Sequence, residues 1–200
     1  MSQIINYGSC CIDHVFQVPH FVRAGETLSS TGYAIFPGGK GLNQSIAVAE
    51  AGCAVNHVGA VGEDGRWLAE LMSARGVDIT HLSIIDSPTG QAILQIDPHA
   101  ENAIFISGGA NLGAHEHLID AALEQATGDE ILLIQNETSG NEAAIRQAKA
   151  KGLQVAFNMA PMNASARALP LALIDYFIIN ETEGEALTGK KKPNEICDAL

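Results

Sequence analysis

The chain has 200 residues, of which 46% are hydrophobic and 5% aromatic, and this is enough apolar material for one large domain with its own core. Its formal net charge is -12 at pH 7, so the basic side chains that nucleic-acid phosphates require are scarce and we expect no nucleic-acid partner. No apolar run approaches the roughly 20 residues that cross a bilayer, and we expect no membrane partner.

Buried strands alternate with helices along most of the chain. Five apolar runs have the length of buried parallel strands, at residues 4–8, 55–61, 131–135, 155–158 and 176–179. Helical periodicity lies between them, at residues 42–51, 65–75, 115–126 and 141–151, and we expect Ser139 to cap the last of these helices. This order predicts an α/β fold with a doubly wound, mainly parallel sheet, whose ligands gather at the carboxyl ends of the strands.

Two regions interrupt this rhythm with alternating polar and apolar residues. They are the segments 12–18 and 31–36, and the segments 91–97 and 103–107. Each pair predicts two antiparallel strands joined by a turn. Together, near residues 12–36 and 91–107, they predict a small β-sheet inserted into the main domain. Such a protruding sheet could serve as a lid or as a subunit interface, and its unpaired edges favour association.

A glycine-rich corner joins the second of these strands to the first helix, in the run Phe36-Pro37-Gly38-Gly39-Lys40-Gly41-Leu42-Asn43. Three glycines in four residues permit positive φ, and the helix start is expected to offer unpaired N–H groups to a hydroxyl or an anion. Ala34 stands where a phosphate loop needs glycine, and Gln44 stands where a dinucleotide fingerprint needs glycine or alanine. A glycine-rich turn without a ligand is the alternative interpretation.

Further motifs occur in a characteristic order along the chain. They are Gly8-Ser9 with Asp13, the corner at 36–43, Ala60-Val61-Gly62-Glu63-Asp64-Gly65, Thr89-Gly90 with Glu101-Asn102-Ala103-Ile104, Gly108-Gly109-Ala110-Asn111 and Asn180-Glu181-Thr182-Glu183. In this order and spacing, the chain from residue 3 to about residue 190 resembles the ribokinase-like (PfkB) family of carbohydrate and nucleoside kinases, and within it looks most like the ribokinases. Members of that family use the inserted sheet both as a lid and as a dimer interface.

The resemblance implies a cytoplasmic, homodimeric carbohydrate kinase that transfers the γ-phosphoryl group of ATP to a primary hydroxyl of a pentose or related sugar. Its cofactors would be ATP and Mg²⁺ and, as in many ribokinases, K⁺. The four cysteines form no Cys-x-x-Cys pair, which by itself indicates reduced thiols in the cytoplasm. Two alternatives remain: a nucleoside kinase of the same fold, for which only Phe36 and Phe105 could supply an aromatic platform, and a non-catalytic sugar-binding protein.

The resemblance also assigns roles to individual residues. It implies sugar contacts by Asp13, Gly39, Lys40, Asn43 and Glu137, and ATP contacts by Asn180 and Glu183, with Glu183 also holding Mg²⁺ through water. From its chemistry alone, the Asp13 carboxylate suits a vicinal diol or a turn, and Glu137 could equally be an exposed loop acid. Asn180 and Glu183 also have the spacing of a capping box, which requires no ligand.

Two features depart from the family pattern. The Gly-Ala-Gly-Asp motif that carries the catalytic base in such kinases does not occur, so we expect no catalytic base within residues 1–200. These residues are expected to form the N-terminal part of one ribokinase-like domain, with the C-terminal part missing, and to be inactive alone. Cys11 stands where ribokinases commonly have a sugar-binding Asn. Because a thiol is a poor hydrogen-bond partner, Cys11 points to a modified sugar or one that lacks a hydroxyl there.

Overall fold

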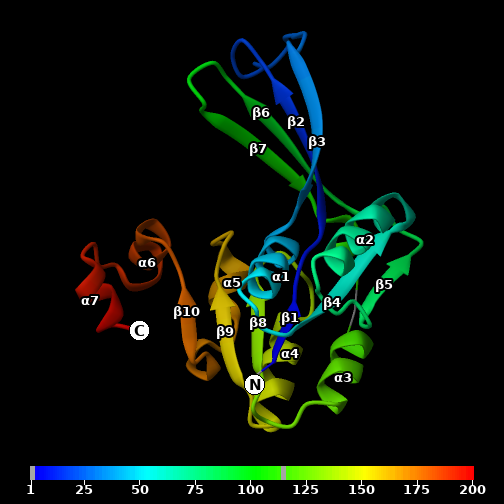
Figure 1. Cartoon of the computed structure of the whole chain (residues 1–200). Coiled ribbons are helices and arrows are strands. Elements are labelled where there is room, and N and C mark those ends of the chain that lie inside the picture. The colour runs from blue at the N-terminus through cyan, green and yellow to red at the C-terminus, as the bar shows by residue number, and fades with distance from the viewer. Residues whose placement is uncertain (1–2, 114–115) are drawn as a thin grey trace.

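A parallel sheet of six strands forms the body of the protein (Figure 1). The computed structural model describes residues 3–113 and 116–200. The strands stand in the order β10-β9-β8-β1-β4-β5 and have the bounds β1 Ile4–Tyr7, β4 Val55–Gly62, β5 Leu82–Ile85, β8 Ile131–Gln135, β9 Gln154–Asn158 and β10 Tyr176–Ile178. The predicted mainly parallel sheet is confirmed. The expectation of a buried strand at residues 176–179 was wrong, because β10 is an edge strand with Tyr176 and Ile178 exposed. Strand β5 was not predicted, because it has only four residues and Ser83 interrupts its apolar run.

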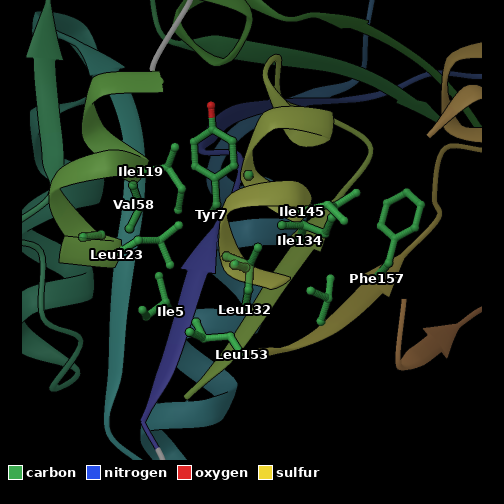
Figure 2. Close-up of a cluster of buried hydrophobic side chains, with 14 of the residues drawn as sticks. Ile5, Tyr7, Val58, Ile119, Leu123, Leu132, Ile134, Ile145, Leu153 and Phe157 are labelled. Atoms are coloured by element: carbon green, nitrogen blue, oxygen red, sulfur yellow. The ribbon is translucent and has the colours of Figure 1, made fainter. Parts of the chain in front are cut away.

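Helices cover both faces of this sheet. Their bounds are α1 Lys40–Glu50, α2 Arg66–Ala74, α3 Glu116–Glu124, α4 Asn141–Ala150, α5 Ala164–Ala168, α6 Glu181–Thr188 and α7 Pro193–Cys197. On one face, α3 and α4 pack with β1, β8 and β9 in a core that includes Tyr7, Ile119, Ile145 and Phe157 (Figure 2). On the other face, α1 and α2 pack through Leu42 and a separate set of apolar side chains. This two-sided covering confirms the doubly wound arrangement.

Helix α4 begins without the side-chain cap that the sequence predicts. Gly140, at φ 76°, is its N-cap residue, and the Ser139 hydroxyl instead donates a hydrogen bond to Gly113 O. The predicted cap was wrong because the left-handed glycine takes the N-cap position and leaves Ser139 one residue too early. The predicted start of α3 at residue 115 lies outside the described residues. Within those residues, no helix has the length and apolar character needed to cross a bilayer.

A second sheet of four strands projects from the body, and we call it the lid (Figure 1). Its order is β3-β2-β6-β7, with bounds β2 Cys11–Gln17, β3 Gly32–Gly38, β6 Gly90–Ile96 and β7 Asn102–Ser107. Strands β2 and β3, and strands β6 and β7, pair antiparallel as predicted, and β2 joins β6 in parallel. Asp13 lies opposite both Phe36 and Ala92, so these three side chains share one face of the lid.

Candidate functional site

Loops at the carboxyl ends of the body strands carry the candidate side chains. The chain leaves β1 through the lid and α1 to reach β4, whereas it leaves β8 through α4 to reach β9, which lies on the opposite side from β4. Neighbouring strands with diverging connections form a switch point, where doubly wound sheets bind ligands. Glu137 follows β8 at this point, while Asn158 ends β9 and Asn180 follows β10 along the same edge of the sheet.

A cavity of about 160 Å³, the first cavity, lies between α1, the loop after β8 and the lid. All five residues predicted to bind a sugar line it, namely Asp13, Gly39, Lys40, Asn43 and Glu137. Its remaining lining residues come from the lid and are Cys11, Ala92, Leu94, Ile104 and Ile106. The cavity thus combines a polar wall with an apolar wall, and a few placed polar groups among apolar ones are typical of small-molecule sites.

The glycine corner is shaped by contact with the chain that leaves β1. Gly39 has φ 94°, and a Cβ atom there would lie 2.7 Å from Ser9 O. A Cβ atom on Gly41 would collide with the backbone of Gly8 and Ser9. Glycine is therefore required at Gly39 by conformation and at Gly41 by space, and both requirements exist whether or not a ligand binds.

The first three N–H groups of α1 all have partners within the protein. Lys40 N donates to Glu137 Oε2 at 3.1 Å. Ser9 accepts the other two, from Gly41 N at its Oγ (3.3 Å) and from Leu42 N at its backbone O (2.9 Å). The expectation that this helix start offers unpaired N–H groups was therefore wrong. Because α1 has no side-chain cap of its own, residues distant in the sequence satisfy its donors.

Glu137 is held from two sides. Its Oε2 atom also accepts a hydrogen bond from Ser9 Oγ at 2.5 Å, and its Oε1 atom lies 3.5 Å from Lys40 Nζ. The Glu137 side chain is 11% exposed, against 38% for Lys40. A carboxylate so enclosed and so fully bonded is not the exposed loop acid that the sequence left open.

Asp13 lies half-buried where the lid meets the body. Its carboxylate covers Gly38 so closely that a Cβ atom at that position would collide with it. Burial raises the pKa of Asp13, and the negative charge of Glu137 raises it further, while His14 and Lys40 oppose the rise. A ligand that donates hydrogen bonds to Asp13 would stabilise the charged form of its carboxyl group.

A second cavity, of about 460 Å³, adjoins the first. Lys40 and Asn43 line both cavities. Asn158, Asn180 and Glu183 supply further polar groups to the second cavity, beside apolar residues from the end of β10. The structure thus brings together all seven residues predicted to bind ligands, in two cavities that share two of them.

Asn180 and Glu183 form a capping box at the start of α6. Asn180 Oδ1 accepts from Glu183 N at 2.8 Å, and Asn180 N donates to Glu183 Oε2 at 3.0 Å. These bonds use only part of the accepting capacity of a carboxylate, which can take up to about four. Carboxylate and amide oxygens are donors that suit Mg²⁺. Within the described residues no group of three or more His, Cys, Asp or Glu side chains could hold a metal ion.

Cys11 presents a neutral thiol to the first cavity. Its side chain is buried, and Asn111 Nδ2 lies 3.6 Å from its Sγ atom. Burial raises the pKa of Cys11 to about 12, and the charges of Glu137 and Asp13 add to the effect. The thiol therefore stays protonated at neutral pH and offers a ligand an essentially apolar contact.

Several supporting contacts around the site were not predicted. Buried Asn111 accepts from Cys10 N and donates to Cys10 O, both at 2.9 Å. Asp64 Oδ1 accepts from Thr89 N at 3.0 Å and from Thr89 Oγ1 at 2.7 Å. These contacts fix the chain where it enters β2 and β6, the two central strands of the lid. The sequence signal was a small polar residue beside glycines in each motif, which identified the motifs but not their partners.

Comparison with known proteins gives the family. The family model described as pfkB family carbohydrate kinase matches residues 1–200. The chain belongs to this family. The ribokinase of Haemophilus influenzae is 38% identical over 193 residues, which cover 94% of this chain and 63% of that protein.

Two solved ribokinase structures extend the likeness to the fold. Ribokinase from Cryptococcus neoformans in complex with ADP is 36% identical with a TM-score of 0.82, over 99% of this chain and 65% of that chain. Arabidopsis thaliana ribokinase complexed with ribose and ATP is 28% identical with a TM-score of 0.82, over 100% of this chain and 67% of that chain. The chain thus spans slightly under two thirds of the length of the first two relatives.

Proposed function

We propose that the full-length protein is a sugar kinase that transfers the γ-phosphoryl group of ATP to a primary hydroxyl of a pentose or related sugar. The observation that carries this proposal is the shared lining of two cavities. The first cavity has hydroxyl-binding groups, and the second has polar groups at the strand ends where nucleotide phosphates bind in such sheets. Lys40 and Asn43 belong to both, as expected of residues between an acceptor and a phosphoryl donor.

The polar wall of the first cavity would fix the sugar. Asp13 and Glu137 would accept hydrogen bonds from its hydroxyl groups, while Lys40 and Asn43 would donate to its oxygens. Held in this way, the reactive hydroxyl would face the second cavity, and such positioning is a large part of phosphoryl-transfer catalysis. Asn180 and Glu183 would hold the nucleotide there, with Mg²⁺ bound through water to Glu183 and neutralising phosphate charge. We assign the catalytic base to none of residues 1–200.

The lining of the first cavity favours a sugar over a nucleoside. Four aliphatic residues of the lid form its apolar wall, and none of the described lining residues is aromatic. A nucleoside kinase would gain from a ring on which to stack the base. The aliphatic wall would instead cover one side of a sugar and exclude water from the reaction.

We also propose that two copies associate through the lid. The strand register places Tyr33, Ile35 and Phe105 on the face opposite Asp13, and they are 52%, 50% and 61% exposed. Tyr33 stacks on Phe16 with ring centroids 4.8 Å apart, which extends this apolar face. Because the opposite face lines the first cavity, a second copy of the chain would cover this one. A cytoplasmic location and activation by K⁺ also belong to the proposal, as the resemblance to ribokinases implies.

The proposal is tested with the product of the complete gene. Coupled detection of ADP release would follow turnover of ATP with Mg²⁺ and D-ribose, 2-deoxyribose or adenosine, with and without K⁺. We expect turnover with a pentose. Turnover with adenosine alone would identify a nucleoside kinase, and calorimetric sugar binding without ADP release would identify a non-catalytic sugar-binding protein.

A further inference from the structure

Ser9 connects the candidate acceptor site to the start of α1. It follows β1, is fully buried, and does not line either cavity. Its single hydroxyl proton goes to Glu137 Oε2, while its oxygen accepts from Gly41 N and its backbone O accepts from Leu42 N. Ser9 thus contacts both Glu137 and the start of α1, the helix that carries Lys40 and Asn43, two further residues expected to bind the sugar.

Glu137 depends on this contact for its position. A glutamate side chain has several freely rotating bonds, and fixing such a side chain has an entropic cost that its bonds must offset. The Oε2 atom of Glu137 has two donors, Ser9 Oγ and Lys40 N, whereas Oε1 has the ion pair with Lys40 Nζ at 3.5 Å. Removing Ser9 Oγ would leave Oε2 with the longer and weaker of its two hydrogen bonds.

We infer that Ser9 is a positioning residue, which orients the Glu137 carboxylate toward the first cavity and, through it, fixes the Lys40 amide at the start of α1. The inference rests on the proposed function only in the claim that Glu137 binds the sugar. The structural part, that Ser9 holds Glu137 against α1, concerns the protein without any ligand. The two parts therefore have separate readouts.

Ser45, which lies within α1, provides a matched control for Ser9. It is also a fully buried serine, but its hydroxyl contacts Asn6 Nδ2 at 2.7 Å and His57 Nδ1 at 2.8 Å, and it has no contact with Glu137. Ser9→Ala and Ser45→Ala therefore remove the same group from equally buried positions. A thermal melt of each variant measures the general cost of that removal.

Native-state hydrogen exchange of the full-length protein tests the structural part. The Lys40 amide donates its hydrogen bond to Glu137, whereas the bonds from α1 to Ser9 come from Gly41 N and Leu42 N. Ser9→Ala is expected to speed its exchange at least about tenfold, whereas Ser45→Ala leaves it within about twofold of wild type. An unchanged Lys40 amide in the Ser9→Ala protein, or equal acceleration in both variants, would overturn the positioning role whatever the protein phosphorylates.

Steady-state kinetics with D-ribose as the probe tests the link to the sugar. Ser9→Ala is expected to raise the KM for D-ribose roughly tenfold and to leave the KM for ATP unchanged. The reason is that the substitution removes a hydrogen bond to the charged Glu137 carboxylate, which is proposed to bind the sugar. In a Glu137→Ala background the same substitution is expected to change the KM for D-ribose by less than about twofold. A tenfold effect that persists without Glu137 would overturn the inference. Wild-type protein that neither binds nor phosphorylates a pentose would instead refute the proposed function, and the exchange measurement would still decide the role of Ser9.

Discussion

Replacing Asp13 by Asn separates ligand binding from stability at one position. The two side chains have nearly the same shape, so the substitution removes the negative charge and keeps one accepting oxygen. Hydrogen bonds to a charged group contribute roughly 1.5–3 kcal/mol, which corresponds to about a ten- to hundredfold change in affinity. Because Asp13 is only half-buried, solvent screening favours the lower end of that range. We expect sugar affinity to fall on the order of tenfold and ATP affinity to stay unchanged.

The same substitution is expected to increase stability. Burial and the neighbouring Glu137 raise the pKa of Asp13 above its ordinary value of 3.8, so the folded state holds the proton more tightly than the unfolded state. Wild-type stability therefore falls as the pH rises from about 3.8 through the raised pKa, and the penalty persists at neutral pH. The neutral amide lacks this penalty, so the Asp13→Asn protein should melt at a higher temperature at pH 7, with the difference shrinking toward pH 4.

Calorimetric titration with D-ribose and thermal melts at several pH values measure the two effects. Asp86→Asn is the matched control, because Asp86 is exposed and lines neither of the two cavities described above. Unchanged sugar affinity in the Asp13→Asn protein would remove Asp13 from the acceptor site. A lower melting temperature at pH 7 would show that the carboxylate stabilises the fold, contrary to the reasoning from burial.

Three further predictions concern selectivity, assembly and completeness. Cys11→Asn should shift the ratio of kcat/KM values toward D-ribose over 2-deoxyribose by roughly tenfold or more, since an amide can bond the 2-hydroxyl group that only D-ribose has. An unchanged ratio would mean that residue 11 does not face carbon 2 of the sugar. Phe105→Glu should convert a dimer at micromolar concentration into a monomer, as measured by sedimentation, with substitution of the exposed Glu101 in the adjoining turn, Glu101→Gln, as the control. A wild-type protein that sediments as a monomer would contradict assembly through the lid. Residues 1–200 alone should show no sugar-dependent ADP release, because loss of a general base and loss of an anion hole each lower the reaction rate on the order of 100-fold or more. Turnover by residues 1–200 would place the catalytic base within them.

Regular elements were predictable where one local signal sufficed. The runs that became β1, β4, β8 and β9 are largely apolar and bounded by polar or glycine residues, as buried parallel strands require. The run that became β10 was recognised by the same apolar character, although this strand lies at the edge of the sheet and is not buried. The alternating segments gave the antiparallel pairs of the lid, but the parallel contact between β2 and β6 is made by strands far apart in the sequence, and no local pattern encodes it. Strand β5 has only four residues, with Ser83 among them, so its apolar run is too short to stand out from a loop.

The start of α1 shows why the glycine corner was only partly predictable. A glycine-rich turn before a helix indicates free N–H groups, and that rule holds where nothing else in the fold reaches them. Here Ser9 and Glu137 reach them from the loops that follow the neighbouring strands β1 and β8, so the donors are used within the protein. Gly39, Lys40 and Asn43 of the corner line the first cavity, and their contact with a sugar stays a prediction. The polar groups that the corner brings to this cavity are side chains rather than backbone N–H groups.

The motifs of this chain act in pairs rather than singly. Ser9 and Glu137 are 128 residues apart, Cys10 and Asn111 are 101 apart, and Asp64 and Thr89 are 25 apart, yet each pair is joined by short hydrogen bonds. Each bond fixes one strand or helix end that borders the lid or the first cavity. A substitution in one motif is therefore expected to displace the side chains of its partner, so that residues outside both cavities control the geometry within them. For this reason the order of the motifs along the chain was sufficient to indicate the family. Which motif residues line a cavity and which support them from outside became clear only from the three-dimensional structure.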